Sequence, residues 1–258
     1  MKQPVVTCLR LLLMLLALSC VTKIANASMM DEITPVSGPV IAPYAWATSI
    51  DGTIGFNGFS VPLNLQTSEL LRGVKYGGMG YVQLPTRKGF WYLEGLGIDF
   101  GQKQFAPFFN QSVKASLYMG EIGYGWNFDF DTNFPIAGTT TLSPYLGARR
   151  IALKATIDGP LLHQSVSENW LDPVFGIIVQ GPLYKDLSYI AKIDGGGFNT
   201  QNSDYRSIAV VLRYAFNPHW AVAAGYRASH FDGTDTSGSG FALNINGKGP
   251  LVGLSYAF

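Results

Sequence analysis

The feature of this sequence that most constrains its fold is a period of two, in which large apolar residues alternate with small or hydroxylated ones. The chain ends in GPLVGLSYAF, where Val252, Leu254, Tyr256 and Phe258 fall on one face of an extended strand. They share that face because successive side chains of a strand point to opposite sides. A strand with one large apolar face and one face of small residues is typical of a sheet whose outer surface contacts lipid.

Three internal segments repeat this pattern. One face of each carries bulky apolar residues: Tyr118, Ile122, Tyr124, Trp126 and Phe128 in the first, Ile208, Val210, Leu212, Tyr214 and Phe216 in the second, and Trp220, Val222, Ala224 and Tyr226 in the third. The opposite faces carry small residues together with Glu121, Arg213 and Arg227. A soluble barrel that carries apolar ligands would need the reverse arrangement, while a soluble sandwich with an aromatic core remains an alternative.

The composition agrees with strands that contact lipid. Charged residues make up 14% of the chain, against about 25% in an average soluble domain. Beyond the first 27 residues, no window offers the roughly 20 consecutive apolar residues that a membrane helix needs. We therefore predict an all-β fold, an antiparallel up-and-down transmembrane β-barrel of about ten strands, with eight or twelve as alternatives.

Turn residues divide the chain into the expected strands. They span residues 41–50, 74–84, 90–100, 113–128, 141–153, 170–181, 187–198, 205–216 and 219–231, with a tenth that ends at 258. Residues 51–72 are expected to form a Gly-rich loop with a helical turn at 68–71, residues 129–139 a turn, and the stretch before residue 170 a polar loop. An even number of strands places both ends of the barrel on one side of the membrane.

The first 27 residues have the pattern of a secretory signal peptide. Lys2 and Arg10 supply positive charge around an apolar run that is too short to span a bilayer, and Ala25-Asn26-Ala27 is a small-x-small cleavage site. An alternative is lipid attachment at Cys20, although Leu18 fits that motif poorly. The predicted organisation is a signal peptide at 1–27, a periplasmic lead-in at 28–39 and the barrel at 40–258.

Cleavage would change the charge and the cysteine content. Lys2, Arg10 and Lys23 would leave, which lowers the 18 basic residues to 15 against 17 acidic ones. A slightly acidic chain gives no support for a nucleic-acid partner. Both cysteines would leave as well, so neither a disulfide framework nor a thiolate metal site is expected. We expect no cofactor and no bound metal.

Several segments then resemble a known group of proteins. They are Pro43-Tyr44-Ala45-Trp46, Gly147-Ala148-Arg149, Trp170 to Gly176, Asp194 to Phe198, Gly225-Tyr226-Arg227, and Gly249-Pro250 with Gly253. Together they resemble a largely uncharacterised family of Gram-negative outer-membrane β-barrels, related in style to OmpA-like and porin-like barrels. The terminal Val252, Leu254, Tyr256 and Phe258 resemble the signature by which such barrels are recognised for insertion. The resemblance implies outer-membrane lipids, periplasmic chaperones and the barrel-assembly machinery as partners, and leaves the oligomeric state open.

Charged residues on the inward faces are the first candidate functional residues. Residues at odd and even positions of a strand point to opposite faces, and we call this alternation parity. By parity with the outward apolar residues, we expect a lumen charge network of Glu121, Arg149, Asp172, Lys192, Asp194, Arg213 and Arg227. Buried charges must be paired or hydrated. Arg149 is expected at the depth of Asp172, and Arg227 near Lys192 and Asp194. The pairs either close the interior or line a narrow, selective pore.

Aromatic residues at strand ends are candidates for the girdles that anchor a barrel at the membrane interfaces. They are Tyr44, Trp46, Trp91, Trp126, Trp170, Phe216 and Trp220.

Catalytic signatures are weak. Of the three histidines, His219 follows a proline at an expected periplasmic turn, while His163 and His230 lie near the expected outer rim. The only candidate for a hydrolytic site is a pair formed by His230 with Asp232 or Asp235, in which a base would activate water. We therefore expect a non-enzymatic barrel with a structural or surface-interaction role and a mostly closed lumen. A narrow pore for small solutes or ions is the alternative, and a hydrolase at the barrel rim is the third possibility.

Overall fold

A computed structural model describes residues 38–56, 59–103, 112–133, 138–158, 163–198, 202–235 and 240–258. The expected signal peptide and most of the lead-in lie outside these residues. The strands are β1 (Val40–Trp46), β2 (Ser49–Phe56), β3 (Phe59–Leu65), β4 (Val74–Thr86), β5 (Gly89–Lys103), β6 (Ser112–Trp126), β7 (Phe128–Thr132), β8 (Gly138–Asp158), β9 (His163–Tyr184), β10 (Leu187–Gly196), β11 (Ser203–Ala215), β12 (Trp220–Thr234) and β13 (Phe241–Ala257). One helix, α2 (Thr67–Gly73), separates β3 from β4.

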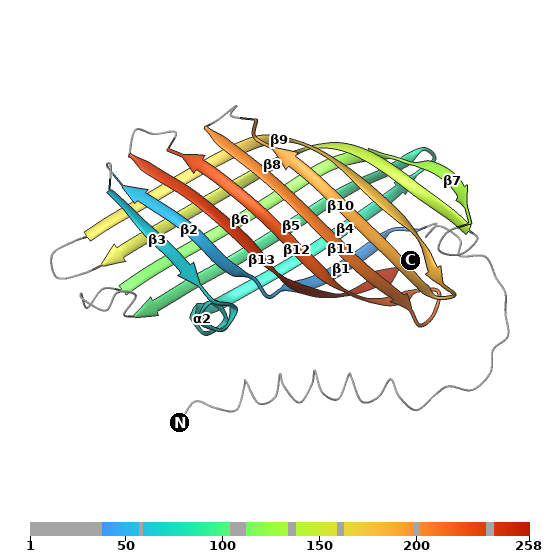
Figure 1. Cartoon of the computed structure of the whole chain (residues 1–258), viewed down its shortest axis with the longest axis horizontal. Helices are drawn as coiled ribbons and strands as arrows, with labels where there is room; N and C mark the ends of the chain where they lie inside the picture. Colours follow the sequence, from blue (N-terminus) through green and yellow to red (C-terminus); the bar gives the residue numbers. More distant parts are fainter. Residues whose placement is uncertain are drawn as a thin grey trace, which may run out of the picture. The chain divides into compact units, whose positions relative to one another are not determined.

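The strands form a closed antiparallel barrel, which confirms the predicted fold class and strand number (Figure 1). Ten of them follow the order β1-β4-β5-β6-β8-β9-β10-β11-β12-β13. The barrel closes because β1 also pairs with β13, with Val40 opposite Ala257 and Tyr44 opposite Gly253. Closure leaves no open sheet edge along the ten-stranded wall at that seam, as a sheet in lipid requires.

The two ends of the barrel differ. Tight connections at residues 87–88, 185–186 and 216–219 join strands at the end where the chain terminates (Figure 1). The β2–β3 hairpin and α2 occupy the opposite half. Short turns mark the periplasmic end of a bacterial barrel, and longer connections mark its outer end. We use "periplasmic end" and "outer end" in this sense.

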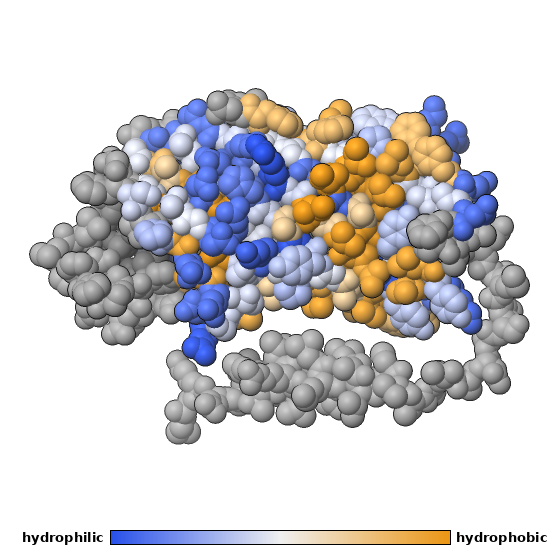
Figure 2. Space-filling model, in the orientation of Figure 1, coloured by the Kyte–Doolittle hydropathy of each residue, from blue (hydrophilic) through white to orange (hydrophobic). Residues whose placement is uncertain are grey.

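The wall carries an apolar band toward its periplasmic end. Ile208, Val210, Leu212 and Tyr214 alternate along β11, and each exposes about half of its surface. The same holds on β12 and β13, as the parity of the sequence predicts. Figure 2 shows hydrophobic residues gathered toward the end where the chain terminates and hydrophilic residues next to them along the barrel. An outward apolar band around a closed antiparallel wall is the arrangement of an outer-membrane barrel.

Three expected connections are partly strand instead. Residues 51–72, expected as a loop, contain most of β2, all of β3 and α2. The polar stretch before residue 170 extends β8 and β9 to 21 and 22 residues. Residues 128–132 form β7, which pairs with β8. The start of β9 alternates in the opposite sense to the apolar band, because Ser165, Ser167 and Asn169 are exposed while Val166 and Trp170 are buried. In residues 51–65, glycines and Pro62 favoured a loop although apolar residues alternate along β3.

The girdle expectation is wrong for three aromatic residues. Tyr44 and Trp46 point into the lumen, where they contact Glu94 and Arg227. Trp170 is 1% exposed and donates from its indole N–H to the carbonyl oxygen of Thr234. Four of the expected girdle residues are exposed on the outer wall toward the periplasmic end: Trp91, Trp126, Phe216 and Trp220. Among the described residues, no helix is long and apolar enough to cross a membrane.

Candidate functional site: the barrel lumen

Six charged side chains meet inside the barrel, and we call them the lumen charge cluster: Glu94, Glu121, Arg149, Lys192, Asp194 and Arg227. They come from β5, β6, β8, β10 and β12. Hydrogen-bond register places the first three in one row, since Glu94 lies opposite Glu121 and Glu121 lies opposite Arg149. Each points inward because its sequence neighbours expose their side chains on the outer wall.

Arg149 joins two carboxylates of the cluster. Its Nε donates to Glu121 Oε2 at 2.7 Å, and its Nη2 donates to Asp194 Oδ1 at 3.0 Å. All three side chains are fully buried. The guanidinium also lies over the ring of Tyr205, with 3.8 Å between Cζ and the ring centroid. A guanidinium held by two carboxylates and a ring face is fixed in position, because its planar fork has few alternative orientations.

Glu94 joins the other two cations. Its Oε2 accepts from Lys192 Nζ at 3.1 Å, and its Oε1 accepts from Arg227 Nη1 at 3.0 Å. Tyr44 donates its hydroxyl to the same Oε1 at 2.7 Å. Tyr92 serves Glu121 in the same way, with 2.8 Å between its hydroxyl oxygen and Oε1. Three cations thus face three carboxylates, so the cluster as defined is formally neutral, which buried charges require.

Apolar layers lie on both sides of the cluster along the barrel axis. Toward the outer end, Trp170 packs edge-on against Phe231, at 5.3 Å between ring centroids. This upper apolar layer is buried and consists of Ile151, Val166, Trp170, Tyr205, Phe231, Phe241 and Leu243. Toward the periplasmic end, a lower layer contains Phe90, Tyr92, Tyr145 and Val174. The order follows from the strands: β12 places Arg227 before Phe231, and β5 places Phe90 before Glu94.

A small cavity of about 210 Å³ adjoins the cluster in the periplasmic half of the lumen. On the side of the cluster, the cavity is lined by Lys192, Glu94 and Arg227. Farther toward the periplasmic end, it is lined by Gln83 and Gln180. Tyr145 also lines it, close to Lys192, with 5.3 Å between Nζ and the Tyr145 ring centroid. The cavity has the volume of about seven water molecules, since a water occupies about 30 Å³ in the liquid.

The expected lumen residues are only partly brought together. Asp172 is buried and accepts from the Ser203 hydroxyl. Although Asp172 lies opposite Arg149 in register, Arg149 donates to Glu121 and Asp194 instead. Arg213 lies nearer the periplasmic end, away from the cluster. Arg227 lies near Lys192, as expected, and the carboxylate that joins them is Glu94. Sequence reasoning missed Glu94 because both faces of β5 carry bulky residues there, with Tyr92 on the face of Glu94 and Leu93 on the other, so the alternation did not show which face points inward.

The expected hydrolytic pair at the rim is not formed. His230 Nδ1 lies 2.9 Å from the side-chain oxygen of Asn246, on the outer wall. Asp232 accepts from Asn244, and Asp235 accepts from the Gly240 N–H. The side chain of His163 lies outside the described residues. Within the described ranges, no group of three or more His, Cys, Asp or Glu residues could hold a metal ion.

Comparison with known proteins gives likeness of fold alone. No family model matches the sequence, and no curated protein sequence matches it. Among solved structures, Neisserial surface protein A is 14% identical, with a TM-score of 0.33, over 86% of this chain and 98% of that one. Ail of Yersinia pestis is 10% identical, with a TM-score of 0.37, over 86% and 99%. The transport unit of the autotransporter AIDA-I from Escherichia coli is 9% identical, with a TM-score of 0.40, over 89% and 93%.

Proposed function

We propose that this protein is a closed, non-enzymatic outer-membrane barrel of a Gram-negative bacterium with a structural or surface-interaction role. The observation that carries the proposal is the stack of layers across the lumen. The lumen charge cluster and the upper apolar layer each draw side chains from opposite walls. Because each is buried and packed, two successive layers separate the periplasmic cavity from the outer end.

The length of the strands supports an exposed role. A tilted strand crosses the bilayer in about 9–11 residues, whereas β8 and β9 have 21 and 22 residues. The excess carries both strands beyond the apolar band on the outer side, where Lys154, Ser167 and Asn169 are exposed. A rigid wall that projects beyond the membrane offers a surface for contact with other molecules.

Delivery is part of the same proposal. Cleavage near Ala27 would release the chain into the periplasm, where chaperones and the barrel-assembly machinery would receive it. The terminal strand has the features such a signal needs, since Val252, Leu254 and Phe258 are exposed on its outer face.

Conductance of the refolded protein in planar bilayers tests the closed lumen. We expect no steady current from the wild type. Trp170→Ala with Phe231→Ala should open the upper apolar layer only, and Arg149→Ala with Glu121→Ala should open the charge cluster only. Each pair should remain silent, because the other layer persists, whereas the four changes together should conduct. Heat-modifiable migration on gels verifies that each variant is folded. Steady current from the wild type would favour the narrow pore instead.

A further inference from the structure

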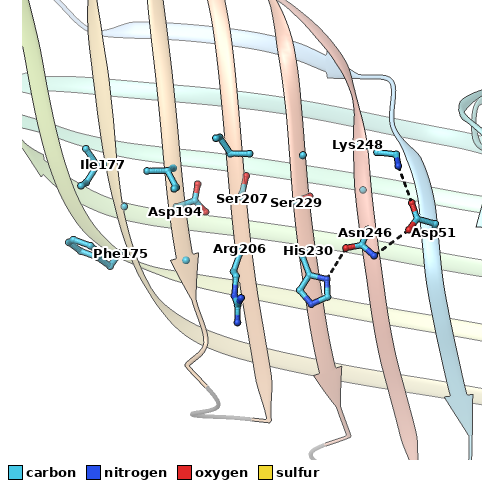
Figure 3. Close-up of a pocket in the computed structure, with 16 residues that line it drawn as sticks. Asp51, Phe175, Ile177, Asp194, Arg206, Ser207, Ser229, His230, Asn246 and Lys248 are labelled. Atoms are coloured by element: carbon cyan, nitrogen blue, oxygen red, sulfur yellow. Dashed lines mark hydrogen bonds and ion pairs between the residues drawn. The ribbon is translucent and has the colours of Figure 1, made fainter.

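The outer wall of the barrel has a hollow of about 820 Å³, whose lining also includes Asp194 and Ser207, although their side chains make hydrogen bonds in the lumen. It crosses β9 to β13 and reaches Asp51 on β2 (Figure 3). Its floor is formed by small residues, since Gly195 and Ala228 line it between larger neighbours. A side chain placed at Gly195 would meet only the backbone oxygen of Tyr205, at 3.5 Å from the Cβ position. The wall is therefore recessed there.

Two parallel rows of outward residues build the hollow, because hydrogen-bond register aligns neighbouring strands. In the outer row, Gly195 lies opposite Arg206, Arg206 lies opposite His230, and His230 lies opposite Asn246. The second row lies two residues nearer the periplasmic end of each strand. Its members in order across the sheet are Ile177, Ile193, Ile208, Ala228 and Lys248.

The lining of the hollow changes along the wall from apolar residues to polar and charged ones, which include Asp51 beside Lys248. The portion on β9 and β10 is lined by Phe175, Ile177 and Ile193, and the portion on β11 to β13 by Arg206, His230 and Lys248. Figure 3 shows Arg206 and His230 projecting side by side toward the outer end. A molecule that filled the hollow would need an apolar body and an anionic or strongly hydrogen-bonding head.

The cations lie at the outer border of the apolar band. On β11, Arg206 follows the exposed series Tyr214, Leu212, Val210 and Ile208 as the next outward residue. On β13, Lys248 follows Leu254, Val252 and the exposed Pro250, and it lies one row nearer the periplasmic end than Arg206. This is the depth at which lipid headgroups meet acyl chains, and basic residues there attract anionic lipids.

Both cations keep donors free for a ligand. Arg206 pairs with Asp204 at 2.9 Å between Nη2 and Oδ2, yet its side chain is 76% exposed. Lys248 Nζ lies 3.8 Å from Asp51 Oδ1, with 60% of its side chain exposed. A guanidinium has five N–H donors and an ammonium has three, so one carboxylate satisfies neither. The two cations lie two strands apart, about 10 Å at the usual strand spacing, so a phosphate group above β12 receives charge-assisted hydrogen bonds from both when the two long side chains turn toward it.

We propose that this hollow is a binding site for one anionic phospholipid or phosphorylated glycolipid of the surrounding membrane. The phosphate is held by Arg206 and Lys248 beside His230, and an acyl chain runs over Gly195 against Phe175, Ile193 and Ile208. The site lies on the outer wall, so it goes beyond the proposed function and is independent of whether the lumen conducts.

Native mass spectrometry of the refolded full chain tests the site. The protein in detergent is titrated with palmitoyl-oleoyl phosphatidylglycerol, with the matching phosphatidylcholine, and with inorganic phosphate. We expect one phosphatidylglycerol to be retained in preference to phosphatidylcholine. Arg206→Gln with Lys248→Gln should weaken that retention about 30-fold, as expected for the loss of two interfacial cations.

Matched controls separate a site from general adhesion of lipid to the wall. Arg150 is an exposed outward cation on β8 that bonds Asn169 outside the hollow, so Arg150→Gln should leave retention unchanged. Gly195→Leu should fill the hollow and abolish retention, whereas Gly120→Leu, at an outward glycine of β6 with open space around it, should not. Equal retention of both lipids, or equal loss in Arg150→Gln and the double variant, would overturn the proposal. Competition by inorganic phosphate at the same concentration as phosphatidylglycerol would make it a free-anion site and overturn the lipid assignment.

Discussion

Arg227 on β12 donates from Nη1 to Glu94 Oε1 on β5, at 3.0 Å and across 133 positions of sequence. Both side chains are 7% exposed. The bond crosses the barrel interior, because β5 and β12 are separated by several strands in either direction around the wall. It therefore ties opposite walls together, which hydrogen bonds between neighbouring strands cannot do.

Loss of Glu94 should destabilise the barrel strongly. Glu94→Ala leaves Arg227 and Lys192 without their shared carboxylate, and an uncompensated buried charge costs about 3–5 kcal/mol. Urea titration of the protein in lipid vesicles, followed by tryptophan fluorescence, measures the change in unfolding free energy. Asp204→Ala removes the partner of the exposed Arg206 and serves as the control, with an expected cost of about 0–1 kcal/mol. Equal costs for the two variants would contradict a buried charge cluster.

A cation on the apolar band should be costly. Val210 and Leu212 are 51% and 48% exposed on the outer face of β11. An arginine at either position should cost up to about 2–4 kcal/mol near the bilayer midplane. Thr139→Arg lies on the exposed face of the β7–β8 hairpin and should cost little. Folding yields in vesicles that are the same for all three variants would mean that the outward face has been assigned wrongly.

The last residue should matter for assembly. The Phe258 N–H donates to the Pro39 carbonyl at 3.0 Å, and its ring packs edge-on against Tyr256, at 4.8 Å between centroids. Deletion of Phe258 should lower the heat-modifiable, folded fraction in outer membranes, whereas Phe258→Trp should preserve it. An unchanged yield after the deletion would show that the terminal aromatic residue is no insertion signal.

Orientation can be measured with single cysteines, because both natural cysteines lie in the expected signal peptide. Ser167 is exposed on the outer half of β9, and Thr139 is exposed near the periplasmic end of β8. In intact cells, a membrane-impermeant maleimide should label Ser167→Cys and leave Thr139→Cys unlabelled until the cells are broken. The reverse labelling would invert the barrel.

Sequence alone determined the barrel and its inside and outside. Where lipid covers one face of a strand, every second residue must be apolar. A single strand such as β11 is long enough to show that period in the sequence. The same local rule sent Glu121, Arg149, Asp194 and Arg227 to the lumen. It failed for residues 51–65, where Gly52, Gly55 and Pro62 favoured a loop although apolar residues alternate along β3, and for the start of β9, where the outward residues are polar.

Tertiary structure decided which charges meet. Parity fixes the face of a side chain but not its depth, and depth depends on the tilt and register accumulated around the closed barrel. Arg149 thus takes Glu121 and Asp194 rather than its register partner Asp172, and Arg227 takes Glu94. The same closure set Arg206 and Lys248 along one hollow from strands whose order in the sequence does not reveal their spacing. Trp170 lies two residues from Asp172, so parity already placed it inside; only the tertiary structure showed that its ring packs in the lumen against Phe231 rather than at the membrane interface.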